Sequence, residues 1–164
     1  MISIEKNTDE NFANIRTIAQ EVWPIAYGAI LRQEQLDYMM EMMYSVSSLR
    51  KQAVSGKDFI LAMENKEAVG FASYEFDCEV ASKTKIHKIY ILSNQQGKGI
   101  GKILIDYISE EAQKRQQSAI VLNVNKHNVA QHFYRKLGFE IIKEEVIDIG
   151  NGYVMDDYVM EMPI

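Results

Sequence analysis

The segment from Gln96 to Lys102 constrains the fold of this chain most, because three of its seven residues are glycine. It follows a strand pattern over 85–92 and leads into a helical pattern from Gly99 to about Arg115. Glycines let the backbone turn sharply and approach a ligand closely. The first amides of a helix lack internal partners, so this junction predicts a pyrophosphate site, with Lys98 and Lys102 adding charge nearby.

The two best-known nucleotide loops do not fit this segment. A triphosphate loop needs glycine five positions before Gly101 and Ser or Thr after Lys102, but the chain has Gln96 and Ile103 there. The dinucleotide fingerprint needs a third glycine at position 102, where the chain has lysine. These two motifs therefore do not identify a ligand, and a glycine-rich turn that caps the helix for structural reasons alone is the alternative.

The rest of the chain alternates between helix and strand patterns without a linker or a repeat, so we expect one domain over residues 1–164. A crossover connection in the second half predicts an α/β (α+β) fold with a mixed sheet. The expected strands are 2–4, 59–63, 69–76, 85–92, 119–124, 139–149 and 158–162, and the expected helices are 12–22 (ended by Trp23-Pro24), 33–43, 47–54, 99–115 and 128–137.

The charge balance and the cysteine count exclude several classes of protein. The chain has 18 Lys and Arg against 23 Asp and Glu, a net charge of -5, which argues against nucleic acid as a partner. Cys78 is the only cysteine, so no internal disulfide can form. No stretch is long and apolar enough to span a membrane, so we expect no membrane partner and a cytoplasmic protein.

Two motifs together resemble the GNAT superfamily of N-acetyltransferases. Gln96, Gly99 and Gly101 match its acetyl-CoA pyrophosphate loop, and the run from Asn128 to Phe139 resembles its second signature. The resemblance implies a GNAT fold with about six to seven strands and four to five helices, and a splayed acetyl-CoA cleft between the fourth and fifth strands. It also implies direct transfer of an acetyl group from acetyl-CoA to the primary amine of a polyamine-like small molecule or a peptide.

The resemblance assigns roles to individual residues. The Ile91 amide would help to bear negative charge on the thioester carbonyl, and Tyr134 would protonate the departing thiolate as general acid. Tyr134 as simple core packing beside Phe133 is the alternative, and we assign Phe133 to packing. The residues that we expect to bind acetyl-CoA are Ile89, Ile91, Gln96, Gly97, Lys98, Gly99, Ile100, Gly101, Lys102, Asn128, Tyr134 and Lys136.

The acceptor side is less defined by the sequence. Trp23, Tyr27 and Glu75 are candidates for contact with the amine, and Glu75 and His87 are candidates for the general base by chain position alone. Asp156 and its neighbour Asp157 lie in a run that resembles the last hairpin of bacterial polyamine N-acetyltransferases, and paired carboxylates attract cations.

Other readings stay open. A non-catalytic acyl-CoA sensor would keep the glycine loop and have no need of Tyr134 as an acid, and an interaction module on the same fold would bind no CoA. An edge strand is compatible with a homodimer. We expect no metal, because His87, His127 and His132 lack ligand partners at useful sequence spacing, and we assign no role to Cys78.

Overall fold

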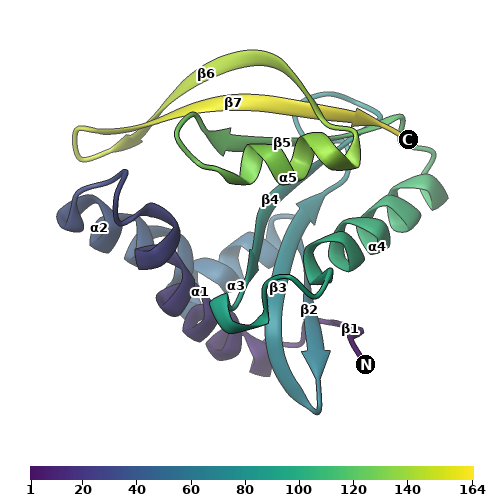
Figure 1. Cartoon of the computed structure of the whole chain (residues 1–164), viewed down its shortest axis with the longest axis horizontal. Helices are drawn as coiled ribbons and strands as arrows, with labels where there is room; N and C mark the ends of the chain where they lie inside the picture. The colour runs from purple at the N-terminus through teal and green to yellow at the C-terminus, as the bar shows by residue number, and fades with distance from the viewer.

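The computed structural model describes residues 1–164 and has one seven-stranded sheet, with helices on both of its faces (Figure 1). The strands are β1 (Ser3–Lys6), β2 (Asp58–Glu64), β3 (Glu67–Glu75), β4 (Lys83–Ile91), β5 (Ala119–Asn125), β6 (Glu140–Gly150) and β7 (Tyr153–Pro163). The helices are α1 (Phe12–Tyr27), α2 (Gln33–Tyr44), α3 (Val46–Val54), α4 (Ile100–Lys114) and α5 (Ala130–Leu137), with short 3-10 turns η1 (Asp9–Asn11) and η2 (Ser93–Gln95). The predicted mixed fold is confirmed.

The strand order is β1-β2-β3-β4-β5-β7-β6, and only β4 and β5 run parallel. Their pairing covers only four residues, from Lys83 opposite Ala119 to Ile86 opposite Leu122. Beyond Ile86 the two strands separate, while β4 stays paired with β3 and β5 stays paired with β7. The expected splay between the fourth and fifth strands is therefore present.

Two apolar cores fill the two faces of the sheet. One core packs α4 and α5 against the sheet, with Leu104 and Ile108 of α4 fully buried. The other packs α1, α2 and α3 against the opposite face, around Ile15, Trp23 and Phe71. The apolar residues of α1 and α4 recur at helical spacing, so each helix buries one face against the sheet.

The prediction that Trp23-Pro24 ends the first helix is wrong, because α1 continues to Tyr27. Proline removes one intrahelical hydrogen bond, to the carbonyl of Gln20, but both Gln20 and Pro24 are exposed, so water can satisfy that carbonyl. Tyr27 is buried after the proline and anchors the last turn. The final strand is also longer than predicted, because β7 pairs along β6 from the turn at Gly150 onward.

A β-bulge interrupts β4 at His87. Ser73 of β3 pairs with Lys88, and Tyr74 pairs with Ile86, so His87 is an extra residue without a partner on β3. Bulges bend a strand and redirect a side chain, and they are frequent beside functional sites. Here the bulge comes directly after the last β4–β5 pair, where the two strands separate.

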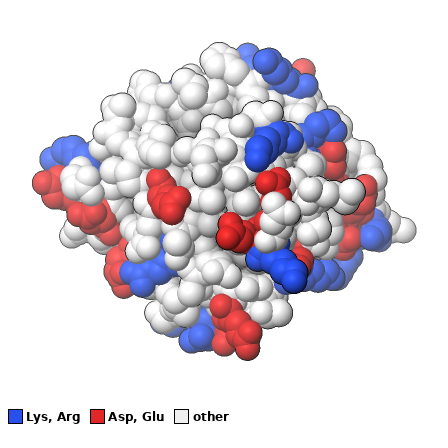
Figure 2. Space-filling model, turned by 60° about the horizontal axis from the view of Figure 1, so that its bottom comes forward, with Lys and Arg blue, Asp and Glu red and all other residues white.

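No helix of the structure is long and apolar enough to cross a membrane. Figure 2 shows a face on which acidic and basic side chains are interspersed, without a broad surface of one sign. That face offers no continuous basic track for a phosphate backbone.

Candidate active site

A cavity of about 810 Å³ opens where β4 and β5 separate. The glycine loop lies at one end of it, and α1 and the start of α5 form further walls. The lining residues used below are Tyr27, His87, Lys88, Ile89, Tyr90, Ile91, Gln96, Gly97, Gly99, Ile100, Gly101, Asn123, His127, Asn128, Phe133 and Tyr134.

The glycine loop has the backbone that a phosphate cradle requires. Gly97 and Gly99 have φ values of +85° and +76°, which favour glycine, and no atom lies within 4 Å of where their Cβ atoms would be. At Gly101 a Cβ would lie 2.9 Å from Cζ of Phe133, so a side chain there would collide with the cavity wall. The loop therefore presents bare backbone to the cavity.

The amides at the start of α4 are available to a ligand. The first hydrogen bond of the helix runs from the Ile103 amide to the Gly99 carbonyl, at 3.1 Å. The amides of the three preceding helical residues, Ile100 to Lys102, therefore precede the intrahelical ladder, at the positive end of the helix dipole. This arrangement suits a pyrophosphate group.

The exposed edge of β4 supplies a second set of backbone donors. The Leu92 amide donates to the Val69 carbonyl at 2.9 Å, on the β3 side. Because successive amides of a strand point in opposite directions, the Ile91 and Ile89 amides point toward the splayed side. The Ile91 amide thus faces the cavity at its junction with the glycine loop.

Tyr134 lies on α5 and lines the same cavity. Its ring packs against Phe133 and Phe139, with centroids 5.3 and 5.8 Å away, and only 8% of the residue is exposed. Burial raises the pKa of the phenol, with a further rise from Tyr27, so the hydroxyl stays protonated at neutral pH. Its hydroxyl is hydrogen-bonded to no protein group and is left for a ligand.

Asn128 and Tyr27 border the middle of the cavity. The Asn128 side chain accepts a hydrogen bond from the Ala130 amide at 2.9 Å and so supports the start of α5. The Tyr27 and Tyr90 hydroxyls lie 3.0 Å apart, joining α1 to β4. Tyr27 is buried and Tyr90 is half-buried, and burial raises the pKa of each phenol.

A buried carboxylate lies beside the cavity wall. Asp157 of β7 is 1% exposed, and its Oδ1 has no hydrogen-bond partner. Its Oδ2 accepts from Nδ2 of Asn123, a lining residue, at 3.3 Å, and the same amide donates to Glu145 at 3.0 Å. Burial raises the pKa of Asp157, and its charge is close enough to contribute to the raised pKa of Tyr27.

Helix α2 is tied to the β6–β7 hairpin by two hydrogen bonds. The Tyr38 hydroxyl of α2 donates to the Ile149 carbonyl at 2.8 Å, and the Gln35 amide donates to the Val154 carbonyl at 3.2 Å. A Cβ at Gly150 would lie 2.7 Å from the Tyr38 hydroxyl, so the turn needs glycine there. We call this the α2–hairpin contact; it lies on the side of the molecule away from α4 (Figure 1).

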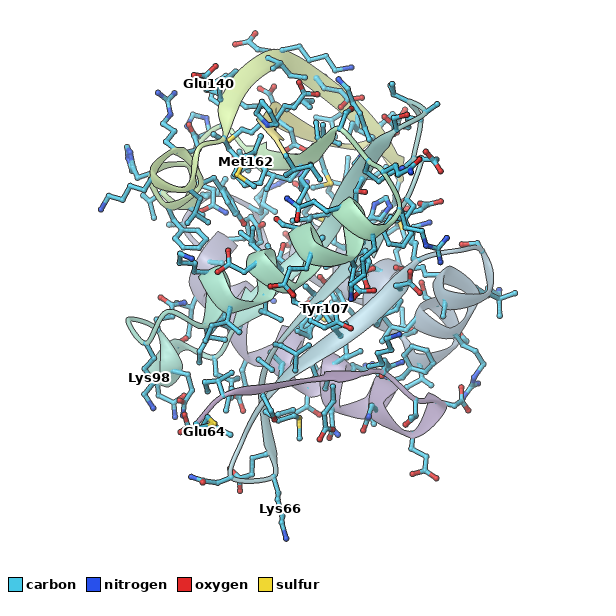
Figure 3. The ribbon with its side chains drawn as sticks, turned by 90° about the vertical axis from the view of Figure 1, so that its right-hand side faces the viewer. Glu64, Lys66, Lys98, Tyr107, Glu140 and Met162 are labelled. Carbon is cyan, nitrogen blue, oxygen red and sulfur yellow. The ribbon has the colours of Figure 1, made fainter.

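Several residues predicted for the site lie outside the cavity lining. Trp23 is 1% exposed and packs against Tyr27 in the core, so it does not line the cleft. Lys98 points away toward Glu64, with their charged atoms 3.5 Å apart, and both are labelled in Figure 3. Lys102 is paired with Asp106 at 2.6 Å.

Lys136 and Glu75 also lie outside the lining. Lys136 is exposed on the last turn of α5. Glu75 is half-buried at the end of β3, and its Oε1 lies 2.9 Å from Nε2 of His87, which does line the cavity. Glu75 therefore contacts the cavity only indirectly, through its hydrogen bond with His87.

Phe133 packs against Tyr134 as assigned, but it is also 37% exposed and forms part of the cavity wall against the glycine loop, a role that the sequence analysis did not give it. Sequence reasoning also missed Asn123, Tyr90 and Lys88. The buried Lys88 donates to Gln52 at 2.8 Å, and burial together with Lys57 lowers its pKa to about 8. The sequence did offer one signal for Lys88: it lies among the apolar residues of a strand pattern, and a lysine on the buried face of a strand is rare.

Comparison with known proteins agrees with this geometry. Residues 29–161 match the family of acetyltransferase (GNAT) domains. An uncharacterized N-acetyltransferase from the pepI 3' region of Lactobacillus delbrueckii subsp. lactis is 22% identical over 94% of both chains. The ribosomal protein bS18-alanine N-acetyltransferase of Haemophilus influenzae is 30% identical over 56% of this chain and 57% of its own.

Among solved structures, the PaiA N-acetyltransferase of Thermoplasma acidophilum in complex with coenzyme A superposes with a TM-score of 0.83. It is 24% identical and covers 100% of this chain and 99% of its own. A glycine loop at a helix start, a splayed parallel strand pair and the match over most of the chain define an acyltransferase. The chain belongs to the GNAT superfamily of N-acetyltransferases.

Proposed function

We propose that this protein transfers an acetyl group from acetyl-CoA directly to a primary amine of a small cationic molecule. One observation carries the proposal: the bare glycine loop, the free Ile91 amide and the unpartnered Tyr134 hydroxyl all border one cavity in a chain of this family. These are the groups that phosphate binding, carbonyl polarisation and thiolate protonation require.

Acetyl-CoA fits the cleft by its chemistry. The amides at the start of α4 would hold its pyrophosphate, and the Gly97 and Gly99 backbones leave room for it. The unpaired edges of β4 and β5 would hydrogen-bond the pantetheine arm, with Asn128 beside it. Lys98, Lys102 and Lys136 would act only from outside the lining. The coenzyme A complex of the Thermoplasma acidophilum relative supports this placement.

The reaction would need two groups at its centre. The Ile91 amide would donate to the thioester carbonyl as negative charge develops on it during attack by the amine. When the tetrahedral intermediate collapses and its C–S bond breaks, the Tyr134 hydroxyl would give its proton to the departing CoA sulfur, and the proton lost by the amine nitrogen would return to the Tyr134 oxygen through solvent. The raised pKa of Tyr134 keeps that proton in place before the reaction.

The acceptor side favours a small cation. A desolvated carboxylate with a free oxygen, such as Asp157, is stabilised by an ammonium group that reaches it. A diamine or polyamine meets this condition, because one amine can react while a second binds the carboxylate.

A peptide amine is the alternative acceptor, and the similarity to a ribosomal-protein alanine N-acetyltransferase favours it. Thiol release from acetyl-CoA in the presence of diamines, polyamines, amino acids and N-terminal peptides separates the two. We expect turnover on the diamines and polyamines. Asp157→Asn should raise their KM by about tenfold or more, the value of a charge-assisted contact, without changing acetyl-CoA affinity. Turnover on peptides alone would refute the small-cation proposal.

A further inference from the structure

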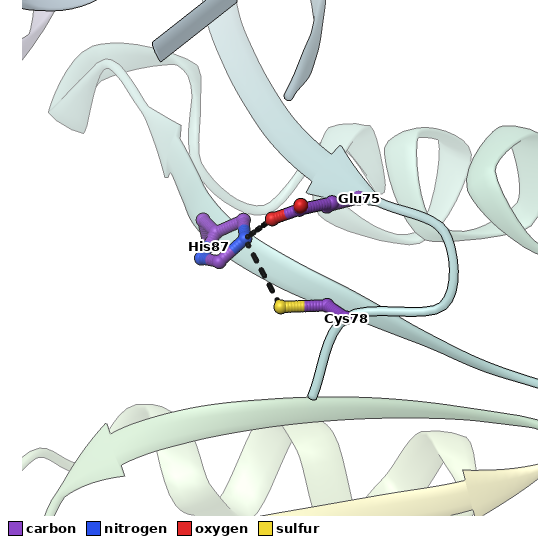
Figure 4. A group of neighbouring side chains, drawn as sticks. All are labelled: Glu75, Cys78 and His87. Carbon is purple, nitrogen blue, oxygen red and sulfur yellow. Dashed lines mark hydrogen bonds and ion pairs between the residues drawn. The ribbon is translucent and has the colours of Figure 1, made fainter. Parts of the chain in front are cut away.

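Three potential metal ligands converge beside the cavity, and the mechanism above does not use them as a group. They are Glu75 at the end of β3, Cys78 in the β3–β4 connection and His87 at the bulge of β4 (Figure 4). Nε2 of His87 lies 2.9 Å from Oε1 of Glu75 and 3.8 Å from Sγ of Cys78. All three ligand atoms lie within 4.8 Å of one another. We propose that Glu75, Cys78 and His87 form a site for a thiophilic divalent metal such as Zn²⁺.

The distances fit tetrahedral coordination. With metal–ligand bonds of about 2.0 to 2.3 Å, ligand atoms in a tetrahedral zinc site lie about 3.3 to 3.8 Å apart. The observed separations are 2.9 and 3.8 Å, with the third pair within 4.8 Å, so they need adjustments of up to about 1 Å, within the reach of side-chain rotation. Three protein ligands leave a fourth position open, as in zinc sites that hold water.

The backbone holds the Cys78 ligand in place. Oδ1 of Asp77 accepts hydrogen bonds from the Ser82 amide at 2.7 Å and from Gln117 at 3.0 Å. Gln117 is itself buried and bonded to Thr84 at 2.9 Å. The connection that carries Cys78 is therefore tied to β4 independently of the cluster. The β-bulge sets the direction of the His87 side chain. The bulge and the hydrogen bonds of Asp77 are therefore two separate features that bring the ligands together.

The ligand atoms already face one another. Nε2 of His87 contacts both Oε1 of Glu75 and Sγ of Cys78, so this ring nitrogen would coordinate the metal. Coordination requires a neutral imidazole and a thiolate. On binding, the Cys78 thiol would release its proton to solvent, and the His87 ring would carry its proton on Nδ1.

The charge balance is also favourable. One carboxylate and one thiolate neutralise a divalent cation, and a sulfur ligand selects Zn²⁺ or Co²⁺ over Mg²⁺ and Ca²⁺. Three lysines face the cluster and oppose a cation. Lys57 lies 3.7 Å from Glu75, Lys85 is paired with Glu79 at 3.2 Å, and Lys88 is held by Gln52. Only Lys57 contacts a ligand, and its partly exposed side chain can turn to solvent.

Titration of tag-free, chelator-treated protein with Co²⁺ tests the site without acetyl-CoA or an acceptor, so its result is independent of the proposed function. We expect one equivalent to bind, with the near-ultraviolet absorption of a cobalt–thiolate bond, and Zn²⁺ to displace it. Cys78→Ser should abolish that absorption. His87→Ala should weaken binding by at least about tenfold, since even indirect supports of a metal ligand contribute that much.

Two further variants separate the proposal from misfolding. His132→Ala removes an exposed histidine of α5 and should leave binding unchanged. Lys57→Ala removes the competing cation and should tighten Co²⁺ binding, a gain that a damaged protein would not give. An absent cobalt–thiolate absorption in the wild-type protein, or one that His87→Ala leaves unchanged, would overturn the proposal.

Discussion

Replacing Tyr134 by phenylalanine tests the centre of the proposed mechanism. The hydroxyl has no protein partner, whereas the ring packs against Phe133 and Phe139. Tyr134→Phe therefore removes one proton donor and keeps the ring contacts. We expect the free energy of unfolding to change by no more than about 0.5 kcal/mol.

The expected loss in turnover is much larger. A positioned general acid contributes about 10²- to 10⁴-fold, equivalent to about 3 to 5 kcal/mol of transition-state stabilisation. The binding groups of the glycine loop and β4 are untouched, so acetyl-CoA affinity should stay within about threefold of the wild type, less than 1 kcal/mol.

The assay combines three measurements on each protein: thiol release at saturating acetyl-CoA, calorimetric titration with acetyl-CoA, and thermal unfolding. Tyr107→Phe is the matched control, because Tyr107 lies on α4 outside the cavity lining. Turnover within threefold of wild type for Tyr134→Phe would refute the general-acid assignment. Equal losses of turnover and affinity would instead assign Tyr134 to binding.

Three further changes have defined outcomes. Gly99→Ala places a side chain at φ +76°, which costs about 1 kcal/mol, so Tm should fall by about 2–4 °C in calorimetry; an unchanged Tm would contradict the left-handed backbone. Tyr38→Phe removes the bond to Ile149, so urea unfolding should show a loss of about 1 kcal/mol, whereas no loss would argue against the α2–hairpin contact. Burial raises the pKa of Asp157, so the folded state binds this proton more tightly than the unfolded chain does. The free energy of unfolding therefore falls as pH rises from the ordinary carboxyl pKa through the raised one. Asp157→Asn should therefore raise Tm at neutral pH more than at acidic pH, and an equal rise at both would refute the buried charge.

Sequence patterns predicted the sheet, the helices and the glycine loop because each depends on local chemistry. The loop needs glycine at positions 97 and 99 for its backbone angles, and those glycines are visible without a structure. The apolar spacing of α4 likewise follows from its burial against the sheet. Where local signals decide the conformation, the prediction holds.

The acceptor side depends on long-range contacts that no local pattern encodes. Asp157 is adjacent to Asn123 only because β7 pairs with β5. Trp23 is buried because it packs against Tyr44 of α2 and Tyr90 of β4. Cys78 lies in the β3–β4 connection, and His87 lies on β4. Gln117, from the loop between α4 and β5, holds this connection in place through hydrogen bonds with Asp77 and Thr84. The Pro24 error has the same origin, since tertiary packing holds the helix beyond the proline.

The bulge has a consequence for how this strand tolerates change in length. Ile86, Ile89 and Ile91 pack into the core beneath α4, whereas Tyr90 and Leu92 pack into the core beneath α1. Side chains of a regular strand alternate between the two faces of the sheet, and this alternation is broken once in β4, at His87. Without His87 the alternation would be regular, and every apolar side chain of β4 would stay on its present face. His87 can therefore be left out of β4 without moving an apolar side chain from one core to the other. A chain shortened by that residue would keep both cores and lose the bend and the imidazole beside the cavity.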